Sequence, residues 1–212
     1  MKNIFWNYVK RLHGVNGFLQ EKFFFRDVKR VRKLCEESKD PYYAIERSYF
    51  FDKQYFLQKW WDKLEYHEKK ELLFYVWGAK VVNVIYGNDW WLPFFKELGF
   101  ISNCGAKQPK DEVVLYRASE EEFKSYMSWT ADLQTAVSYQ KIKPPIPSKV
   151  NVYKTTVRPS AVLAIVDGTF WVTDGYNVEG VLKGNEYIVN HNKLSNIKEV
   201  DTDELCSNSI KN

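Results

Sequence analysis

The hydrophobic pattern changes period near residue 100, and this change limits the possible folds more than any other feature of the sequence. Before it, apolar residues recur at the i, i+3, i+4 spacing of amphipathic helices, which predicts helices over 23–37, 55–64 and 68–77. After it, β-branched and aromatic runs between turn residues predict strands over 112–118, 151–157, 161–167, 186–190 and 197–200. The sequence therefore predicts an α+β chain with a helical N-terminal part followed by a sheet.

Local signals refine this prediction. Asp52 is a suitable N-cap for the helix over 55–64. Two shorter helices are expected over 119–126 and 132–140, and Ser119 with Glu122 has the spacing of a capping box for the first. A turn-rich stretch over 99–109 marks the change of period. We therefore predict a helical, aromatic-rich, basic region over 1–105 and a separate sheet domain over 106–212.

Aromatic residues and positive charge are concentrated in the N-terminal half. Residues 1–100 contain 26 of the 36 aromatic residues and 18 basic against 13 acidic side chains, whereas residues 101–212 contain 13 basic and 14 acidic. A row of cations along one face of a helix suits a nucleic acid or an acidic protein as a partner, although most charged helix faces are only solvated. Five cations form such a row on one side of the predicted helix over 23–37: Lys22, Arg26, Lys29, Arg30 and Lys33.

Several classes of protein do not fit the sequence. The longest aliphatic run, 161–166, is far shorter than the roughly 20 residues that cross a bilayer, and we expect no signal peptide. Cys35, Cys104 and Cys206 are widely spaced, which argues against a disulfide framework or a zinc site. The three histidines show no ligand spacing. We therefore expect a cytoplasmic protein without a bound metal.

Polar residues at three strand ends could carry chemistry. Arg117 closes the strand over 112–118, Ser128 and Thr130 flank Trp129, and Glu186 begins a later strand. Taken singly, each has a structural explanation, namely a surface arginine, a helix N-cap region and a solvated edge charge. The residue types alone do not decide between these structural explanations and a functional site.

Together, and in this order, the three segments resemble the mono-ADP-ribosyltransferase family. "VVLYRA", "SWTADLQTAVSYQ" and "NEYIVN" are similar to the three blocks of the class marked by an arginine, a Ser-x-Thr element and a glutamate. The resemblance covers about 111–200. It implies a split β-sheet catalytic domain and NAD as a substrate, with no metal.

The resemblance also implies a role for each residue. Glu186 is expected to be the catalytic carboxylate that stabilises the positive charge developing on the ribose. Arg117 is expected to hold the NAD phosphates and the nicotinamide-side ribose. The Ser128 hydroxyl would hold the catalytic carboxylate, and Thr130 would brace the strand with it. An aromatic wall for the nicotinamide is expected from Trp129, Tyr126 or Tyr139.

The sequence departs from the family pattern at Gly184. Family members that modify arginine have a second glutamate two residues before the catalytic one, and many others have a glutamine. An arginine acceptor is therefore not expected. Glu179 is the only carboxylate close by in sequence, and a loop over 174–185, including Gly184 and Asn185, is expected to face the acceptor.

The functional expectation is a mono-ADP-ribosyltransferase that modifies a protein or a nucleic acid. The resemblance places it with bacterial toxins of toxin–antitoxin and phage-defence systems or with phage effectors, which implies an antitoxin or inhibitor protein as a further partner and no membrane. One alternative is an NAD glycohydrolase with water as the acceptor. The other is a catalytically silent module that binds nucleic acid or protein.

Overall fold

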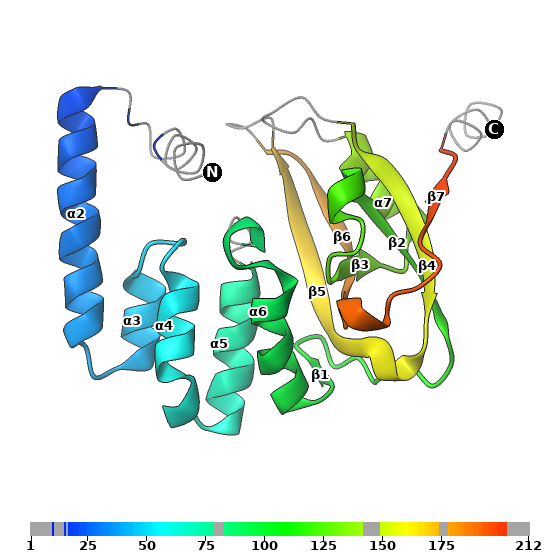
Figure 1. Cartoon of the computed structure of the whole chain (residues 1–212), viewed down its shortest axis with the longest axis horizontal. Helices are drawn as coiled ribbons and strands as arrows, with labels where there is room; N and C mark the ends of the chain where they lie inside the picture. Colours follow the sequence, from blue (N-terminus) through cyan, green and yellow to red (C-terminus); the bar gives the residue numbers. More distant parts are fainter. Residues whose placement is uncertain are drawn as a thin grey trace. The chain divides into compact units, whose positions relative to one another are not determined.

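The computed structural model describes residues 17–78, 83–141, 149–173 and 178–202, together with Lys10 and Val15. Its contacts divide the chain into two compact units, Met1–Ile85 and Tyr86–Asn212. Cys206 lies outside the described residues. Helices occupy the first unit and a mixed sheet the second, which confirms the predicted order of helices before strands (Figure 1).

The first unit is built from helices, and the apolar spacing predicted those described except the one over 41–47. They are α2 (Phe18–Glu37), α3 (Pro41–Arg47), α4 (Lys53–Trp60), the short 3-10 turn η1 (Trp61–Lys63) and α5 (Tyr66–Gly78). Asp40 caps α3 by accepting from the backbone N–H groups of Tyr42 and Tyr43. Asp52 occupies the N-cap position of α4 without a capping hydrogen bond, because its carboxylate lies 3.5 Å from Arg32 Nη1 instead.

The core of the first unit lies between short helices. Phe56 and Leu57 of α4 are fully buried, as is Leu73 of α5, and these residues follow the predicted helical spacing. The buried Lys53 ammonium group donates to the carbonyl oxygens of Ile45 (2.7 Å) and Glu46 (3.0 Å). These carbonyls lie near the C-terminus of α3, so Lys53 satisfies acceptors that the helix leaves open.

Helix α6 (Asn83–Leu98) is interrupted at Gly87, whose φ of 69° and ψ of 178° are not helical. A residue with a side chain rarely adopts this backbone conformation, so glycine suits the position. The division of contacts falls just before it, between Ile85 and Tyr86, and the buried Trp91 and Phe95 belong to the second unit. The change in composition over 99–109 lies later, because these aromatic residues continue the helical pattern beyond the interruption.

The second unit contains a seven-stranded sheet in the order β1-β5-β6-β3-β2-β4-β7. The strands β1 and β5 are parallel and the other neighbours are antiparallel. The strands are β1 (Ile101–Ser102), β2 (Val113–Ser119), β3 (Ser128–Thr130), β4 (Asn151–Val157), β5 (Val162–Thr173), β6 (Val178–Val189) and β7 (Lys198–Val200). The intervening elements are η3 (Glu121–Phe123), α7 (Leu133–Lys141), η4 (Pro159–Ala161) and η5 (His191–Lys193).

Two local predictions are wrong. Ser119 ends β2 opposite Asn151, so sheet pairing replaces the helix and capping box expected from that residue, and only the 3-10 turn η3 follows. The expected loop over 174–185 is β6 from Val178 onward. Glycine suggested a loop there, but Gly184 lies opposite Gly168 in the ladder between β5 and β6.

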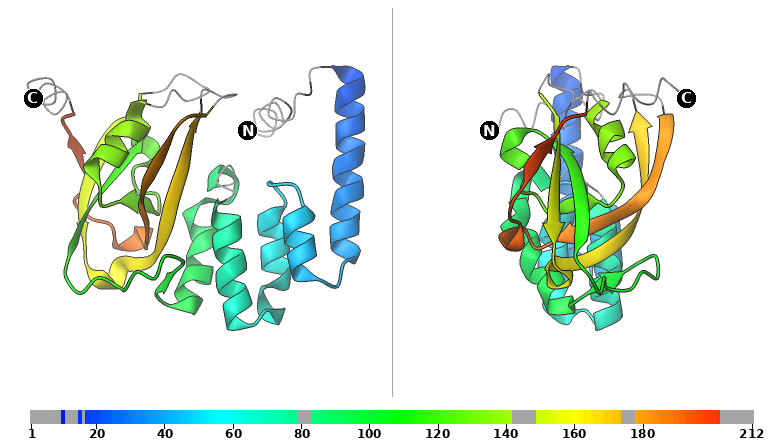
Figure 2. Two further views of the ribbon diagram at one scale, coloured as in Figure 1. Left: turned by 180° about the vertical axis from the view of Figure 1, so that it is seen from behind. Right: turned by 90° about the vertical axis from the view of Figure 1, so that its right-hand side faces the viewer.

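Helix α7 packs on the sheet through β2, β3, β4 and β6. Figure 2 shows the helix lying over the strands from two further directions. Its Ala136 and Val137 cluster with Val152 of β4. A second cluster includes Leu115 of β2 and Trp129 of β3. Since neighbouring strand residues point to opposite faces, this arrangement decides which residues of β3 can meet Glu186.

Candidate active site

Glu186 lies in the middle of the sheet, on β6, between Thr130 of β3 and Val166 of β5. Only 3% of it is exposed. A buried carboxylate needs a hydrogen-bond donor or a positive charge nearby. The residues around Glu186 supply both, and they come from β2 and β3.

Ser128 provides the donor. Its hydroxyl donates a hydrogen bond to Glu186 Oε1. Ser128 and Thr130 are two residues apart on β3, so they share a face, and the pairing of Thr130 with Glu186 puts the carboxylate on that face. The structure therefore brings together the serine and the glutamate that the sequence singled out.

Arg117 provides the positive charge. Its Nη1 donates to the Ser128 carbonyl at 2.6 Å and its Nε to the Phe123 carbonyl at 3.1 Å. If the ladder between β2 and β3 continued beyond the pair Tyr116–Thr130, Ala118 would lie opposite Ser128. Instead, the Arg117 guanidinium donates to the Ser128 carbonyl. Among the described residues, Nη2 has no hydrogen-bond partner, so one edge of the guanidinium remains for an anion.

Burial lowers the pKa of Arg117 to about 10, while the negative charge of Glu186 acts in the opposite direction. The guanidinium therefore stays protonated at neutral pH. Its carbon lies 5.5 Å from the centroid of the Tyr126 ring. Burial also raises the pKa of Tyr139, and the Glu186 charge adds to that rise. Tyr126 thus lies within the electrostatic reach of Arg117, and Tyr139 within that of Glu186.

Thr130 takes part in the turn that follows β3. Its hydroxyl accepts from the backbone N–H of Asp132 at 3.2 Å. The Asp132 carboxylate in turn accepts from the backbone N–H groups of Gln134 and Thr135 and from the Thr135 hydroxyl. Asp132 is thus the N-cap of α7, which fixes the helix beside Glu186.

By strand alternation, Arg117 shares a face of the sheet with Tyr153, its partner on β4. Trp129 lies on that face too, opposite to the face of Ser128, Thr130 and Glu186. It is 2% exposed and belongs to the cluster with Leu115, and its indole N–H donates to the Tyr126 carbonyl at 2.6 Å. One residue along a strand changes the face, so the tryptophan between Ser128 and Thr130 points into the core. The expected aromatic wall for nicotinamide therefore cannot come from Trp129.

The residues expected to face the acceptor all belong to β6. Gly184 lies beneath α7, where a Cβ would approach Thr135 Oγ1 to 3.3 Å. Asn185 is exposed and pairs with Asp167. The backbone of Glu179 lies in the strand β6, at an irregularity of register, and not in a loop.

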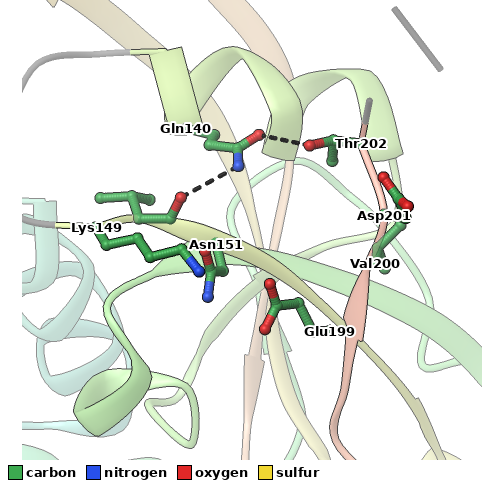
Figure 3. A pocket seen from close by; sticks show the side chains of 8 residues that line it. Gln140, Lys149, Asn151, Glu199, Val200, Asp201 and Thr202 are labelled. Carbon is green, nitrogen blue, oxygen red and sulfur yellow. Dashed lines mark hydrogen bonds between the residues drawn. The ribbon is translucent and has the colours of Figure 1, made fainter. Parts of the chain in front are cut away.

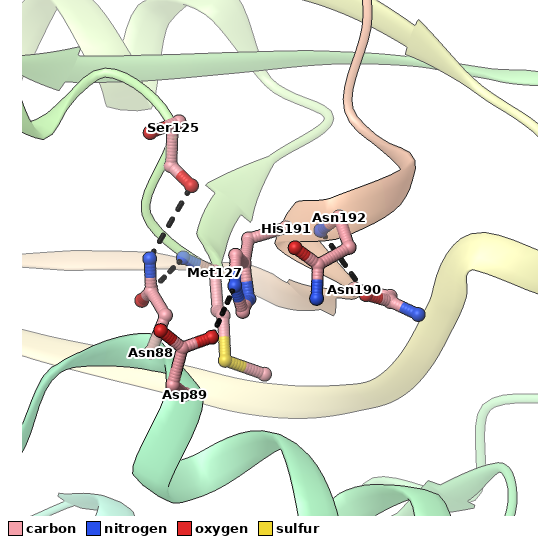
Figure 4. A network of polar contacts seen from close by, with 7 residues as sticks. All are labelled: Asn88, Asp89, Ser125, Met127, Asn190, His191 and Asn192. Atoms are coloured by element: carbon pink, nitrogen blue, oxygen red, sulfur yellow. Dashed lines mark hydrogen bonds and ion pairs between the residues drawn. The ribbon is translucent and has the colours of Figure 1, made fainter.

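Asn88, which the sequence analysis did not single out, supports the segment before Ser128. Its side-chain amide donates to the Ser125 carbonyl (3.4 Å) and its carbonyl accepts from the Met127 N–H (3.3 Å), as Figure 4 shows. Next to it, Asp89 lies 3.0 Å from His191 Nε2. The one sequence signal for Asn88 is its place directly after Gly87, where the chain leaves the helix.

A cavity of about 550 Å³ lies near β4 and the edge strand β7 (Figure 3). Its lining includes Lys149, Asn151 and Glu199 but not Glu186. Gln140 of α7 borders it and bonds to the Val150 carbonyl and the Thr202 hydroxyl. The cavity and the buried carboxylate are therefore separate features.

No protein-family model matches the chain, and neither a curated protein nor a solved structure gives a significant match. Within the described residues, no helix is long and apolar enough to cross a membrane. The same residues include no group of three or more histidine, cysteine or acidic side chains placed to hold a metal ion. A functional assignment therefore depends on the geometry around Glu186.

Proposed function

We propose that the protein is a mono-ADP-ribosyltransferase that cleaves NAD and transfers ADP-ribose to a macromolecular acceptor. The observation that carries this proposal is the buried Glu186 carboxylate, held by the Ser128 hydroxyl and lying within the field of the Arg117 guanidinium. Three separate segments supply these groups, in the order arginine, serine and glutamate that the resemblance requires.

In this proposal Arg117 binds the substrate. Two of its nitrogens hold the backbone around β3, so the guanidinium is fixed before the ligand arrives. Its Nη2 edge would donate charge-assisted hydrogen bonds to the pyrophosphate. Because two backbone contacts already position the guanidinium, little side-chain freedom is lost on binding.

Glu186 would supply the electrostatic part of catalysis. The bond between ribose C1′ and the nicotinamide nitrogen breaks, its electron pair leaves with nicotinamide, and positive charge develops on the ribose. A carboxylate fixed by Ser128 stabilises that charge and accepts a hydrogen bond from the ribose 2′-hydroxyl. The acceptor then bonds to C1′ and loses a proton. Since Glu186 is 3% exposed, the groups that cover it must move when the ribose enters.

Glu186→Gln tests the proposal most directly. The amide retains the shape of the side chain but loses its charge, so we expect a folded protein that binds NAD and transfers no label from radiolabelled NAD. Glu199→Gln, which changes an exposed carboxylate on β7, is the matched control and should retain transfer. Full transfer by the Glu186 variant would contradict the assignment. Nuclease or protease treatment of a labelled cell extract would show which acceptor carries the ADP-ribose.

Hydrolysis is the second candidate, and Gly184 favours it. The place two residues before Glu186 carries no side chain that could orient a macromolecular acceptor, and Thr135 lies close to it. Water could then take the ADP-ribose. Nicotinamide release by the purified protein alone would support an NAD glycohydrolase. If NAD neither shifts the melting temperature nor releases nicotinamide, a silent binding module would replace both enzymes.

A further inference from the structure

Helix α2 presents a positively charged face that nothing in the proposed reaction uses. The helix has 20 residues and is about 30 Å long. Its Val28 and Cys35 are buried, and Val28 packs with Phe51. The five cations singled out in the sequence are all exposed: Lys22, Arg26, Lys29, Arg30 and Lys33.

Ion pairs divide these cations into two groups. Arg30 pairs with Asp27 at 2.6 Å and Lys33 with Glu37 at 3.7 Å. In the described part of the chain, Lys22, Arg26 and Lys29 form no ion pair. From Lys22 to Lys29 there are seven steps of 1.5 Å, or about 10 Å of helix, which matches about three phosphates of a stacked strand at roughly 3.4 Å each. These three cations lie within the first 12 of the 20 residues of α2.

Exposed apolar side chains lie among these cations. Phe18 is 81% exposed, Leu19 66% and Phe23 55%. The Arg26 guanidinium carbon lies 4.9 Å from the centroid of the Phe23 ring. Exposed rings and guanidinium planes are the surfaces on which unpaired bases stack, whereas an acidic peptide needs only the charges.

We propose that α2 binds single-stranded nucleic acid, with Lys22, Arg26 and Lys29 contacting phosphates and Phe23 stacking on a base. The charge of the cations complements the phosphodiester backbone, and the ring beside them gives a contact that backbone charge alone does not provide. This function belongs to the first unit and does not depend on NAD cleavage by the second.

Binding of fluorescein-labelled oligouridine and oligothymidine to the full chain, measured by anisotropy at several salt concentrations, tests the proposal. Replacing Lys22, Arg26 and Lys29 together by glutamine should weaken binding and make the slope of log K against log salt shallower by about 2, since each phosphate contact on a single strand contributes about 0.7. The matched control replaces Lys107, Lys110 and Lys154, three exposed lysines of the second unit, by glutamine and should leave the slope unchanged.

Phe23→Ala separates stacking from charge. It should weaken oligonucleotide binding about fivefold or more while leaving the salt slope unchanged. The proposal is overturned if neither oligonucleotide binds at low salt, if the triple variant keeps the wild-type slope, or if Phe23→Ala has no effect. Equal binding of poly-glutamate would assign the face to an acidic protein instead. Comparison of oligouridine with oligothymidine distinguishes RNA from DNA, and NAD consumption measured in parallel reports separately on the second unit.

Discussion

Ser128 and Glu186 belong to adjacent antiparallel strands, and the serine hydroxyl donates to the glutamate carboxylate across the ladder between them. The two residues are 58 positions apart in the sequence. Their contact is set by strand register, so both groups are held by backbone pairing on either side. This is the kind of rigid support that a precisely placed catalytic carboxylate requires.

Ser128→Ala should lower kcat for NAD cleavage by about tenfold to a hundredfold, since a buried carboxylate loses a donor worth about 1–3 kcal/mol. Steady-state kinetics would measure it. Because Arg117 is retained, KM for NAD should change less than kcat. Ser125→Ala removes an exposed hydroxyl from the preceding segment and is the control. An unchanged kcat in the Ser128 variant would show that the hydrogen bond has no part in the reaction.

Asn88→Ala should reduce kcat severalfold, because the segment before Ser128 loses contacts to the Ser125 carbonyl and the Met127 N–H. It should also lower the free energy of unfolding by about 1 kcal/mol. Kinetics and urea unfolding measured together would show both effects. Asp89→Asn, at the neighbouring position, should retain kcat. A loss of stability with no change in kcat would make Asn88 a purely structural residue.

Gly184→Ala should destabilise the second unit by about 1 kcal/mol, because the new methyl group approaches Thr135 Oγ1 to 3.3 Å. Thr135→Ala alone also costs stability, since the Thr135 hydroxyl donates to Asp132. In the double variant the new methyl group has room. The double variant should therefore lose less unfolding free energy than the two single variants lose together. Urea unfolding of the four proteins measures this coupling. Strict additivity would indicate that the contact is absent.

Asp132→Ala should cost about 1 kcal/mol at pH 7, because α7 loses its N-cap. The hydrogen bond from Thr135 holds the pKa of Asp132 below its ordinary value of 3.8. A carboxyl with a lowered pKa stabilises the fold above pH 3.8, and that contribution disappears as the pH falls through the folded-state pKa. The stability difference between wild type and Asp132→Asn should therefore shrink at low pH. Unfolding curves at pH 7 and pH 3 would reveal a constant difference if the charge played no part.

Three helices of the first unit, α2, α4 and α5, could be predicted because large apolar residues mark their inner faces, as Phe56 and Leu57 do in α4. The lengths of β5 and β6 could not. Glycine is typical of turns, yet Gly168 and Gly184 lie within β5 and β6, where pairing across a long hairpin satisfies their backbone groups. Local preference gives way where a partner strand supplies hydrogen bonds.

The site shows the same division between local and distant information. The order of Arg117, Ser128 and Glu186 drew attention to residues that the fold places close together. Trp129 was misassigned because its neighbours suggested chemistry, whereas strand alternation sends it into the core. Only its place after Gly87 marked Asn88 in the sequence, because it binds backbone atoms of residues 37 and 39 positions later, and any residue type can supply those.

The guanidinium of Arg117 donates to the carbonyl of Ser128, as a backbone N–H does elsewhere in a sheet. Loss of this side chain would leave that carbonyl without its donor and allow β2 and β3 to pair further along their length. Substitution at residue 117 would thus alter the separation of two strands as well as remove a charge. Lysine, a point donor, cannot span both carbonyls in the same way. Sheet pairing and the proposed binding of an anion therefore both depend on this one side chain.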